Sequence, residues 1–108
     1  MTKLPGHDIN NMRIIAKKPL KDYWQKEPAA RAPMEAWHAE ARHANWASPA
    51  DVKAMYGAAS ILKNGRVVFN IGGNKYRLVV WINYEFHIIY IRFVGTHKEY
   101  DAIDAQTI

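Results

Sequence analysis

Three β-capable runs, separated by short clusters of turn-forming residues, fill the second half of this chain from Ile61 onward. The runs are rich in β-branched and aromatic residues, which favour strands. Connections this short join antiparallel strands, because a parallel pair needs a crossover of a dozen or more residues. The sequence therefore predicts an antiparallel meander with strands over residues 66–71, 75–83 and 86–94 and turns over residues 63–66, 72–74 and 83–85.

The residues before the meander carry helical patterns. Apolar residues recur every three to four positions in two segments, 19–27 and 33–43, which is the spacing of one helix face. Ser48 followed by Pro49 and Asp51 resembles a capping box and predicts a further helical turn over residues 51–56. A short β-capable run, residues 12–16, precedes the helices. We expect an α+β fold in which this strand and a helical hairpin pack on one face of the meander.

Composition limits the domain organisation and the location of the protein. The chain has 108 residues, of which 49% are apolar, so we expect one domain over residues 12–108. Residues 1–11 are polar, lack periodicity and are expected to form a flexible arm or extension. The absence of cysteine excludes disulfides, thiolate zinc sites and a cysteine nucleophile, and favours the cytoplasm. No apolar run reaches the ~18–20 residues of a membrane span, so no membrane partner is expected.

Period-two alternation predicts which side chains each face of the sheet carries. Alternate residues of the three strands should face the helices: Val67, Phe69 and Ile71, then Tyr76, Leu78 and Val80, then Ile89, Ile91 and Phe93. The opposite face then collects Asn70, Lys75, Arg77 and Arg92, with no acid among them. Residues 61–100 hold six cations against two acids, a net charge of +4. This face favours an anionic partner, although a solvated face without function, DNA, phospholipid and an acidic protein all remain open alternatives to RNA.

A second group of polar side chains follows the last strand. His97, Lys98, Tyr100 and Asp101 lie within five residues, and an imidazole exchanges a proton near neutral pH. Strict alternation places His97 opposite to Arg92 unless Gly95 resets the direction of the chain. Two structural readings stay open: a packing role for Tyr100, and Asp101 as the cap of a helix over residues 102–105. The histidines lack metal-ligand spacing, so neither a metal nor another cofactor is expected.

Two strings in this half of the chain resemble the HigB toxins of bacterial type II toxin–antitoxin pairs, which belong to the RelE-like superfamily. They are VFNIGGNKYRL at residues 68–78 and YIRFVGTHKEYD at residues 90–101, and the resemblance extends over about residues 12–104. It implies a small RelE-like fold and a ribosome-dependent endoribonuclease that cuts messenger RNA in the ribosomal A site, beside small-subunit ribosomal RNA. It also implies a helix-turn-helix antitoxin of the HigA type, through which alone the toxin reaches operator DNA.

The resemblance also implies roles for individual residues. Arg77 takes the place of an arginine that contacts the scissile phosphate, and His97 stands where relatives place a group for proton transfer or charge stabilisation. Tyr100 and Asp101 match the terminal motif of the family. Asn70 stands where many relatives have a catalytic lysine, which puts a lysine-based scheme in doubt.

These residues predict a metal-independent cleavage by the 2′-hydroxyl group of RNA. In this hypothesis His97 and Tyr100 transfer protons, Arg77 and Arg92 stabilise the transition state, and the remaining polar residues, Asn70, Lys75, Lys98 and Asp101, bind RNA. Two other classes of function remain as alternatives. One is a toxin of the same fold that inhibits a target by binding alone, as the gyrase-directed relatives do. The other is a non-catalytic RNA-binding protein that stacks bases on Trp81 and Tyr90.

Overall fold

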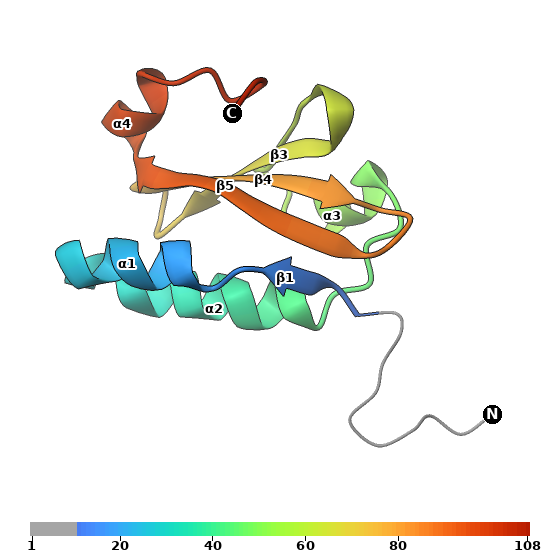
Figure 1. The fold of residues 1–108 in the computed structure, drawn as a ribbon, viewed down its shortest axis with the longest axis horizontal. Helices are drawn as coiled ribbons and strands as arrows, with labels where there is room; N and C mark the ends of the chain where they lie inside the picture. The colour runs from blue at the N-terminus through green and yellow to red at the C-terminus, as the bar shows by residue number, and fades with distance from the viewer. Residues whose placement is uncertain (1–10) are drawn as a thin grey trace.

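The structure is a computed structural model that describes residues 11–108; all of the predicted arm except Asn11 lies outside the described residues. Figure 1 shows two helices below a sheet and the end of the chain above it. The strands are β1 (Arg13–Ile15), β2 (Ser60–Ile61), β3 (Arg66–Ile71), β4 (Tyr76–Asn83) and β5 (Ile88–Thr96). The helices are α1 (Lys18–Lys26), α2 (Arg31–Arg42), α3 (Pro49–Met55) and α4 (His97–Asp101), with 3₁₀ turns η1 (Pro28–Ala30) and η2 (Lys63–Gly65). The predicted α+β class is confirmed.

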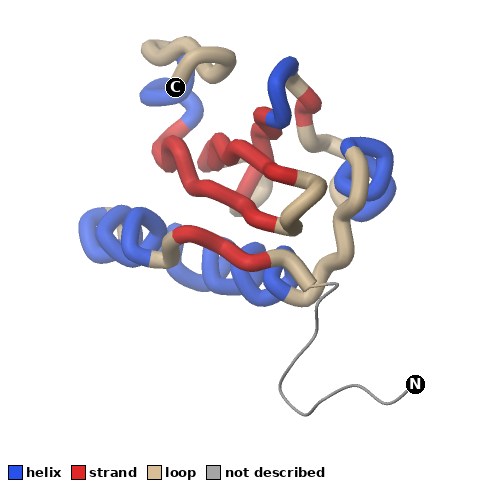
Figure 2. Tube along the Cα trace, turned by 45° about the vertical axis from the view of Figure 1, so that its right-hand side comes forward, coloured by secondary structure: helices blue, strands red, loops and turns tan. Residues whose placement is uncertain are grey.

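The predicted meander forms the centre of a five-stranded sheet with strand order β1-β5-β4-β3-β2. Strands β3, β4 and β5 pair antiparallel, as expected from their short connections. Strand β1 pairs parallel with β5, and β2 forms the opposite edge of the sheet. The chain thus passes from one edge of the sheet to the other through the helices before it builds the centre, as the tube in Figure 2 shows.

Positive backbone φ angles explain the turn before β3. Asn64 and Gly65 have φ angles of 59° and 79°, the left-handed region that an Asn-Gly pair adopts most easily. The turn after β3 continues through Lys75, so β4 begins one residue later than predicted. The turn before β5 covers residues 84–87, and β5 therefore begins at Ile88 rather than Phe86 and runs on to Thr96. Strand ends are the least determined part of a sequence-based prediction, and alternation did not reveal these shifts.

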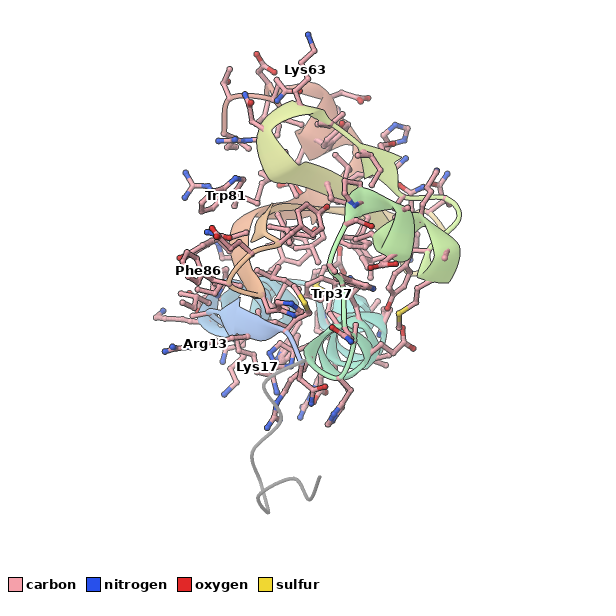
Figure 3. The ribbon with its side chains drawn as sticks, turned by 90° about the vertical axis from the view of Figure 1, so that its right-hand side faces the viewer. Arg13, Lys17, Trp37, Lys63, Trp81 and Phe86 are labelled. Atoms are coloured by element: carbon pink, nitrogen blue, oxygen red, sulfur yellow. The ribbon has the colours of Figure 1, made fainter. Side chains whose placement is uncertain are left out.

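The main core lies between the helices and one face of the sheet. Leu20 and Met34 are fully buried there, and the Trp37 ring lies 5.3 Å from the ring of Phe69 on β3. Figure 3 shows Trp37 inside this layer. The predicted inward residues of β3 and β4, together with Ile89 and Ile91 of β5, all belong to this cluster or pack against it. The helical hairpin is therefore fixed to the sheet by the apolar stripes that its sequence predicts.

The opposite face of the sheet departs from prediction. A β-bulge at Arg92 separates Phe93, which pairs with Val79, from Ile91, which pairs with Val80. The extra residue reverses the alternation, so Phe93 points away from the helices and the predicted inward position was wrong. Phe93 joins a second apolar cluster around the buried residues Val68, Val79 and Ala105. The centre of this face is consequently covered by α4 and the segment 102–108, and is not an open basic surface.

Two predicted helix caps also differ. Ser48 occupies the cap position before α3, but its side chain makes no capping hydrogen bond; the Asp51 carboxylate instead accepts one from the Ala47 amide at 2.9 Å. No helix covers residues 102–105, since α4 ends at Asp101. The last helix therefore begins directly where β5 ends, and this junction places the polar residues of the second motif.

Candidate active site

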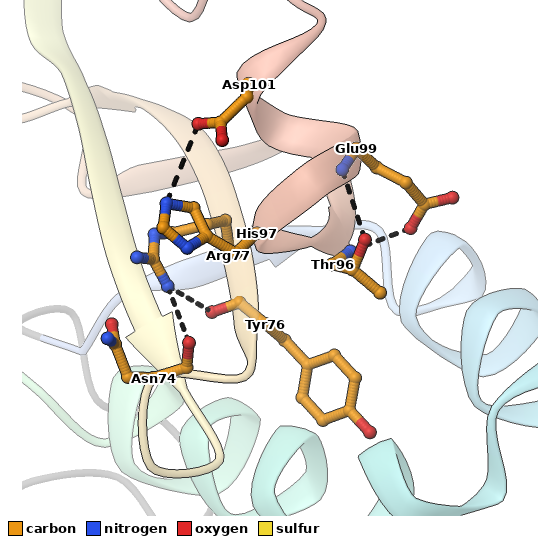
Figure 4. Close-up of polar contacts among 7 residues, drawn as sticks. All are labelled: Asn74, Tyr76, Arg77, Thr96, His97, Glu99 and Asp101. Atoms are coloured by element: carbon orange, nitrogen blue, oxygen red, sulfur yellow. Dashed lines mark hydrogen bonds and ion pairs between the residues drawn. The ribbon is translucent and has the colours of Figure 1, made fainter.

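Arg77 is the one charged residue in the described part of the chain that is buried, with 8% of its surface exposed. It lies on β4 opposite Asn70 of β3 and Gly95 of β5, on the face away from α1 and α2. Its Nη1 donates hydrogen bonds to the main-chain oxygens of Asn74 at 3.0 Å and Tyr76 at 3.4 Å. The turn before β4 thus holds the guanidinium in place (Figure 4).

No carboxylate within residues 11–108 forms an ion pair with Arg77, and its other guanidinium N–H groups make no hydrogen bond there. Taking a cation out of water without a counter-ion costs several kcal/mol, and such groups are normally paired. A guanidinium with free donors in a fixed orientation matches the oxygens of a phosphate. Within residues 11–108 the Arg77 guanidinium therefore has donors that could bind an anion.

The junction of β5 and α4 lies beside this arginine. The His97 amide donates to the main-chain oxygen of Lys75 at 3.3 Å, which fixes the start of α4 to the turn that holds Arg77. Thr96 caps α4: its hydroxyl accepts from the Glu99 amide at 3.1 Å, and the Glu99 carboxylate accepts from the Thr96 amide at 2.7 Å. This reciprocal capping box fixes His97 as the first residue of the helix.

Gly95 is required at this junction for steric reasons. A Cβ atom there would lie 2.7 Å from Cζ of Phe93 and 3.0 Å from Oε1 of Glu99. The ring of Phe93 and the capping carboxylate therefore occupy the space that any other residue at position 95 would need. Gly95 stays within β5 and does not form the bulge that the sequence suggested for it.

His97 and Asp101 form a pair on one face of α4. Nε2 of His97 lies 3.6 Å from Oδ1 of Asp101, and their side chains are 57% and 64% exposed (Figure 4). Water screens a pair this exposed, so the contact contributes little to stability. The contact places the imidazole beside Asp101 and leaves the ring exposed. The pair is thus suited to proton transfer.

The other predicted site residues divide into two groups. Asn70 is opposite Arg77 and shares its face, and Lys98 is exposed on α4 beside His97. The Tyr100 ring packs against the second apolar cluster, as the structural reading expected, while its hydroxyl has no hydrogen bond to residues 11–108. Lys75 points elsewhere, since its Nζ lies 5.9 Å from the ring centre of Tyr76 in the helix-covered core.

Arg92 does not lie with Arg77, although the sequence analysis grouped them. The bulge turns its side chain towards Arg66 and Trp81, where its Nε donates to the main-chain oxygen of Ile108 at 3.4 Å. The geometry therefore gives no support to the predicted transition-state role of Arg92. Alternation alone could not reveal this, because it assumes an unbroken strand.

The sequence analysis missed the contact that joins α1 to α4. The Tyr23 hydroxyl donates to Oε1 of Glu99 at 3.4 Å, and burial together with the Glu99 charge raises the pKa of Tyr23 to about 12. The hydrogen bond from the Thr96 amide lowers the pKa of Glu99 below its usual value. Tyr23 thus stays protonated and Glu99 stays charged at neutral pH. The spacing T-x-x-E at residues 96–99 was the available signal for the cap.

The site combines a buried arginine with an exposed imidazole. Among the residues that the structure describes, no three histidines or carboxylates lie close enough to hold a metal ion. No helix in that part of the chain is long and apolar enough to cross a membrane. The site residues themselves are thus one fixed arginine, one accessible imidazole with a carboxylate partner, and nearby groups that donate hydrogen bonds.

The residues of this site belong to a region that known proteins share. The sequence profile of a family described as HigB toxin, RelE-like toxic component of a toxin–antitoxin system, matches residues 30–103. The mRNA interferase toxin HigB of Escherichia coli strain K12 is 34% identical over 96 residues, which cover 87% of this chain and 92% of that protein. The mRNA interferase HigB of Shigella flexneri gives the same values. The mRNA interferase HigB of Escherichia coli O6:H1 is 22% identical over 94 residues, 85% of this chain and 91% of that protein. This chain therefore belongs to the HigB family of RelE-like toxins, the toxic components of toxin–antitoxin systems.

Proposed function

We propose that this chain is an mRNA interferase, a toxin that cleaves messenger RNA on the ribosome without a metal ion. The observation that carries the proposal is the buried guanidinium of Arg77, which has no acidic partner among residues 11–108 and lies at the junction that presents His97. A phosphodiester supplies the missing anion. The relatives named mRNA interferase support RNA as the substrate.

The reaction uses the 2′-hydroxyl group of the nucleotide before the cut. This hydroxyl loses its proton, its oxygen bonds to phosphorus, the bond from phosphorus to the 5′-oxygen breaks, and that oxygen gains a proton. Arg77 binds the non-bridging oxygens and stabilises the charge that grows on them. His97, paired with Asp101, serves one proton transfer, and the hydroxyl of Tyr100 serves the other. The products are a 2′,3′-cyclic phosphate and a 5′-hydroxyl.

Asn70 and Lys98 position the RNA around the reacting phosphate. Asn70 lies across the strand pair from Arg77, and its amide, which donates to the main-chain oxygen of Ala58 at 3.4 Å, is proposed to contact an adjacent sugar or phosphate. Lys98 adds an exposed positive charge beside His97, whereas Lys75 points away from this site. Arg92 has no part in this site, because the bulge directs it towards Arg66.

The exposure of His97 supports a dependence on the ribosome. An imidazole that is 57% exposed and held only by an exposed Asp101 has no strong fixed geometry towards a flexible RNA strand. A ribosome that holds the message in its A site supplies the alignment that the toxin alone lacks, and alignment lowers the barrier by several kcal/mol. Small-subunit ribosomal RNA is then the second surface that the toxin contacts.

Membership of a two-component family implies a cognate antitoxin. A helix-turn-helix antitoxin of the HigA type would neutralise this chain by direct binding and would carry it to operator DNA. Translating ribosomes place the action of the toxin in the cytoplasm.

The test compares His97→Ala and Arg77→Ala with the matched surface variant Arg42→Ala in a translating extract. Each of the first two is expected to lower the cleavage rate about 10²–10³-fold, the usual cost of removing one such group. Arg42 is exposed on α2, on the other side of the sheet, so its replacement leaves cleavage unchanged. Full cleavage by both site variants contradicts the assignment. Growth arrest without cleavage by the unaltered chain would favour a toxin that acts by binding alone.

A further inference from the structure

A second cluster of cationic and aromatic side chains lies on the same sheet face as Arg77, towards the other end of β4. Arg66, Trp81 and Tyr90 are direct cross-strand partners in one row across β3, β4 and β5. The rings of Trp81 and Tyr90 are stacked, with centres 5.0 Å apart and planes inclined by 23°. The bulge adds Arg92 to this row, so two guanidinium groups flank an aromatic pair.

The cluster borders a cavity. A hollow of about 350 Å³ is lined by Asn64, Arg66, Trp81 and Arg92. A neighbouring hollow of about 470 Å³ shares Asn64 and Trp81 and continues over the turn that contains Gly65. Spaces of about 300–1,000 Å³ accommodate small organic ligands, and a nucleotide falls in this class. The cluster is thus a shaped surface and not a row of isolated side chains.

The two arginines converge on one oxygen atom. Nε and Nη2 of Arg66 donate to the main-chain oxygen of Ile108 at 3.1 and 3.0 Å, and Nε of Arg92 donates to the same atom at 3.4 Å. No aspartate or glutamate in the described region forms an ion pair with either arginine. The Ile108 oxygen occupies this position in the structure, so a phosphate oxygen would have to take its place to bind both guanidinium groups.

Trp81 differs from the other tryptophans of the chain. Trp24, Trp37 and Trp46 are buried in the main core, whereas Trp81 is partly exposed on the opposite face, at the periphery of the molecule (Figure 3). Core packing explains the first three but does not require the indole of Trp81 beside two arginines. Aromatic rings next to cations are the surface on which single-stranded nucleic acids stack their bases.

From these contacts we infer that the cluster binds a nucleotide of single-stranded RNA, with the phosphate at Arg66 and Arg92 and the base against Trp81. Trp81 lies four positions along β4 from Arg77, a distance of about 13 Å along the strand. The covered centre of the face, around Val79, lies between them. The cluster is thus a binding site separate from the reacting phosphate. The inference rests on the proposed function for the class of ligand, RNA, but not on cleavage.

Binding is tested with the full chain and two probes: a single-stranded 2′-O-methyl RNA oligonucleotide, which cannot be cleaved by 2′-hydroxyl attack, and purified small ribosomal subunits. Trp81→Ala is expected to bind about 10-fold more weakly, since stacking of one base contributes about 1–3 kcal/mol. Trp81→Phe retains an aromatic face, so its affinity stays near that of the unaltered chain. The quenching of tryptophan fluorescence by the oligonucleotide is lost in this variant, because the remaining tryptophans are buried.

Salt dependence tests the arginines. Arg92→Gln is expected to reduce the slope of log K against log salt by about 0.7, the value for one lost phosphate contact on a single strand. The control Arg42→Gln removes the same charge from the helix layer and keeps the slope. A loss seen with the oligonucleotide assigns the site to the message, and a loss seen only with the subunits assigns it to ribosomal RNA.

The inference is overturned if Trp81→Ala and Arg92→Gln bind both probes as tightly as the unaltered chain, or if Arg42→Gln weakens binding as much as Arg92→Gln does. Thermal unfolding of each variant shows whether it is folded. If Trp81→Ala does not fold, the loss of fluorescence quenching in Trp81→Phe still tests the role of Trp81. Binding is measured here without cleavage. A chain that binds RNA at this cluster but does not cut it would therefore contradict the proposed function and leave this inference standing.

Discussion

Replacing Arg77 by methionine separates the contribution of this side chain to folding from its contribution to chemistry. Methionine keeps a similar length along the sheet but carries no charge. The variant loses the hydrogen bonds from Nη1 to the main-chain oxygens of Asn74 and Tyr76, of which only the first, at 3.0 Å, is short. A hydrogen bond from a charged donor contributes about 1.5–3 kcal/mol. The variant also escapes the cost of keeping an unpaired guanidinium at 8% exposure, which is several kcal/mol.

These two effects oppose each other and are of similar size. We therefore expect the free energy of unfolding of Arg77→Met to change by less than about 1 kcal/mol in either direction, while cleavage of translated messages falls about 10²–10³-fold. Urea unfolding followed by tryptophan fluorescence measures the first quantity, and primer extension on the messages measures the second. A loss of more than about 3 kcal/mol, the range for breaking a compensated buried pair, would show that Arg77 is a structural residue and refute the reasoning.

Three further predictions concern the junction of β5 and α4. Thr96→Ala removes the cap of α4 and should lower the free energy of unfolding by about 1 kcal/mol. It should also slow cleavage, because the cap fixes the position of His97. Thr96→Ser keeps the hydroxyl, so its stability and its cleavage rate should stay near those of the unaltered chain in the same assays. The pKa of Tyr23 is raised from 10 to about 12, so the stability that its protonated hydroxyl contributes is present below pH 10 and is lost as the pH rises to 12. The free energy of unfolding of Tyr23→Phe should therefore fall less between pH 10 and pH 12 than that of the unaltered chain. If both fall equally over this range, the contact with Glu99 is contradicted. Gly95→Ala places a Cβ atom 2.7 Å from the Phe93 ring and should destabilise the fold, with partial recovery in Gly95→Ala/Phe93→Leu, as thermal unfolding would report.

The local rules of the sequence predicted most of the fold. Asn64-Gly65 and Gly72-Gly73-Asn74 marked their turns because few other residues adopt positive φ angles so readily. The apolar spacing of Met34, Trp37 and Ala41 predicted the buried face of α2. The parallel pairing of β1 with β5 was not predictable in this way, because it depends on how the whole chain closes around the sheet.

The candidate site was predicted less completely, and Arg92 shows why. One extra residue in β5 reverses every later side chain, yet nothing in the sequence of that strand marks the bulge. It moved Phe93 into the second cluster and Arg92 towards Arg66. By contrast, Arg77 and Asn70 were placed together correctly because an unbroken hairpin joins their strands. Alternation therefore predicted the faces of side chains where the strand pairing is unbroken, as in β3 and β4, but not beyond the bulge in β5.

The most direct measurement of the central claim is the chemistry of the RNA ends made by the unaltered chain on translated messages. Attack by the 2′-hydroxyl at the Arg77 and His97 site predicts fragments with a 2′,3′-cyclic phosphate and a 5′-hydroxyl, and no cut where the nucleotide before the bond is a deoxynucleotide. Fragments with a 3′-hydroxyl and a 5′-phosphate, or cutting that persists at the deoxynucleotide, would contradict the account.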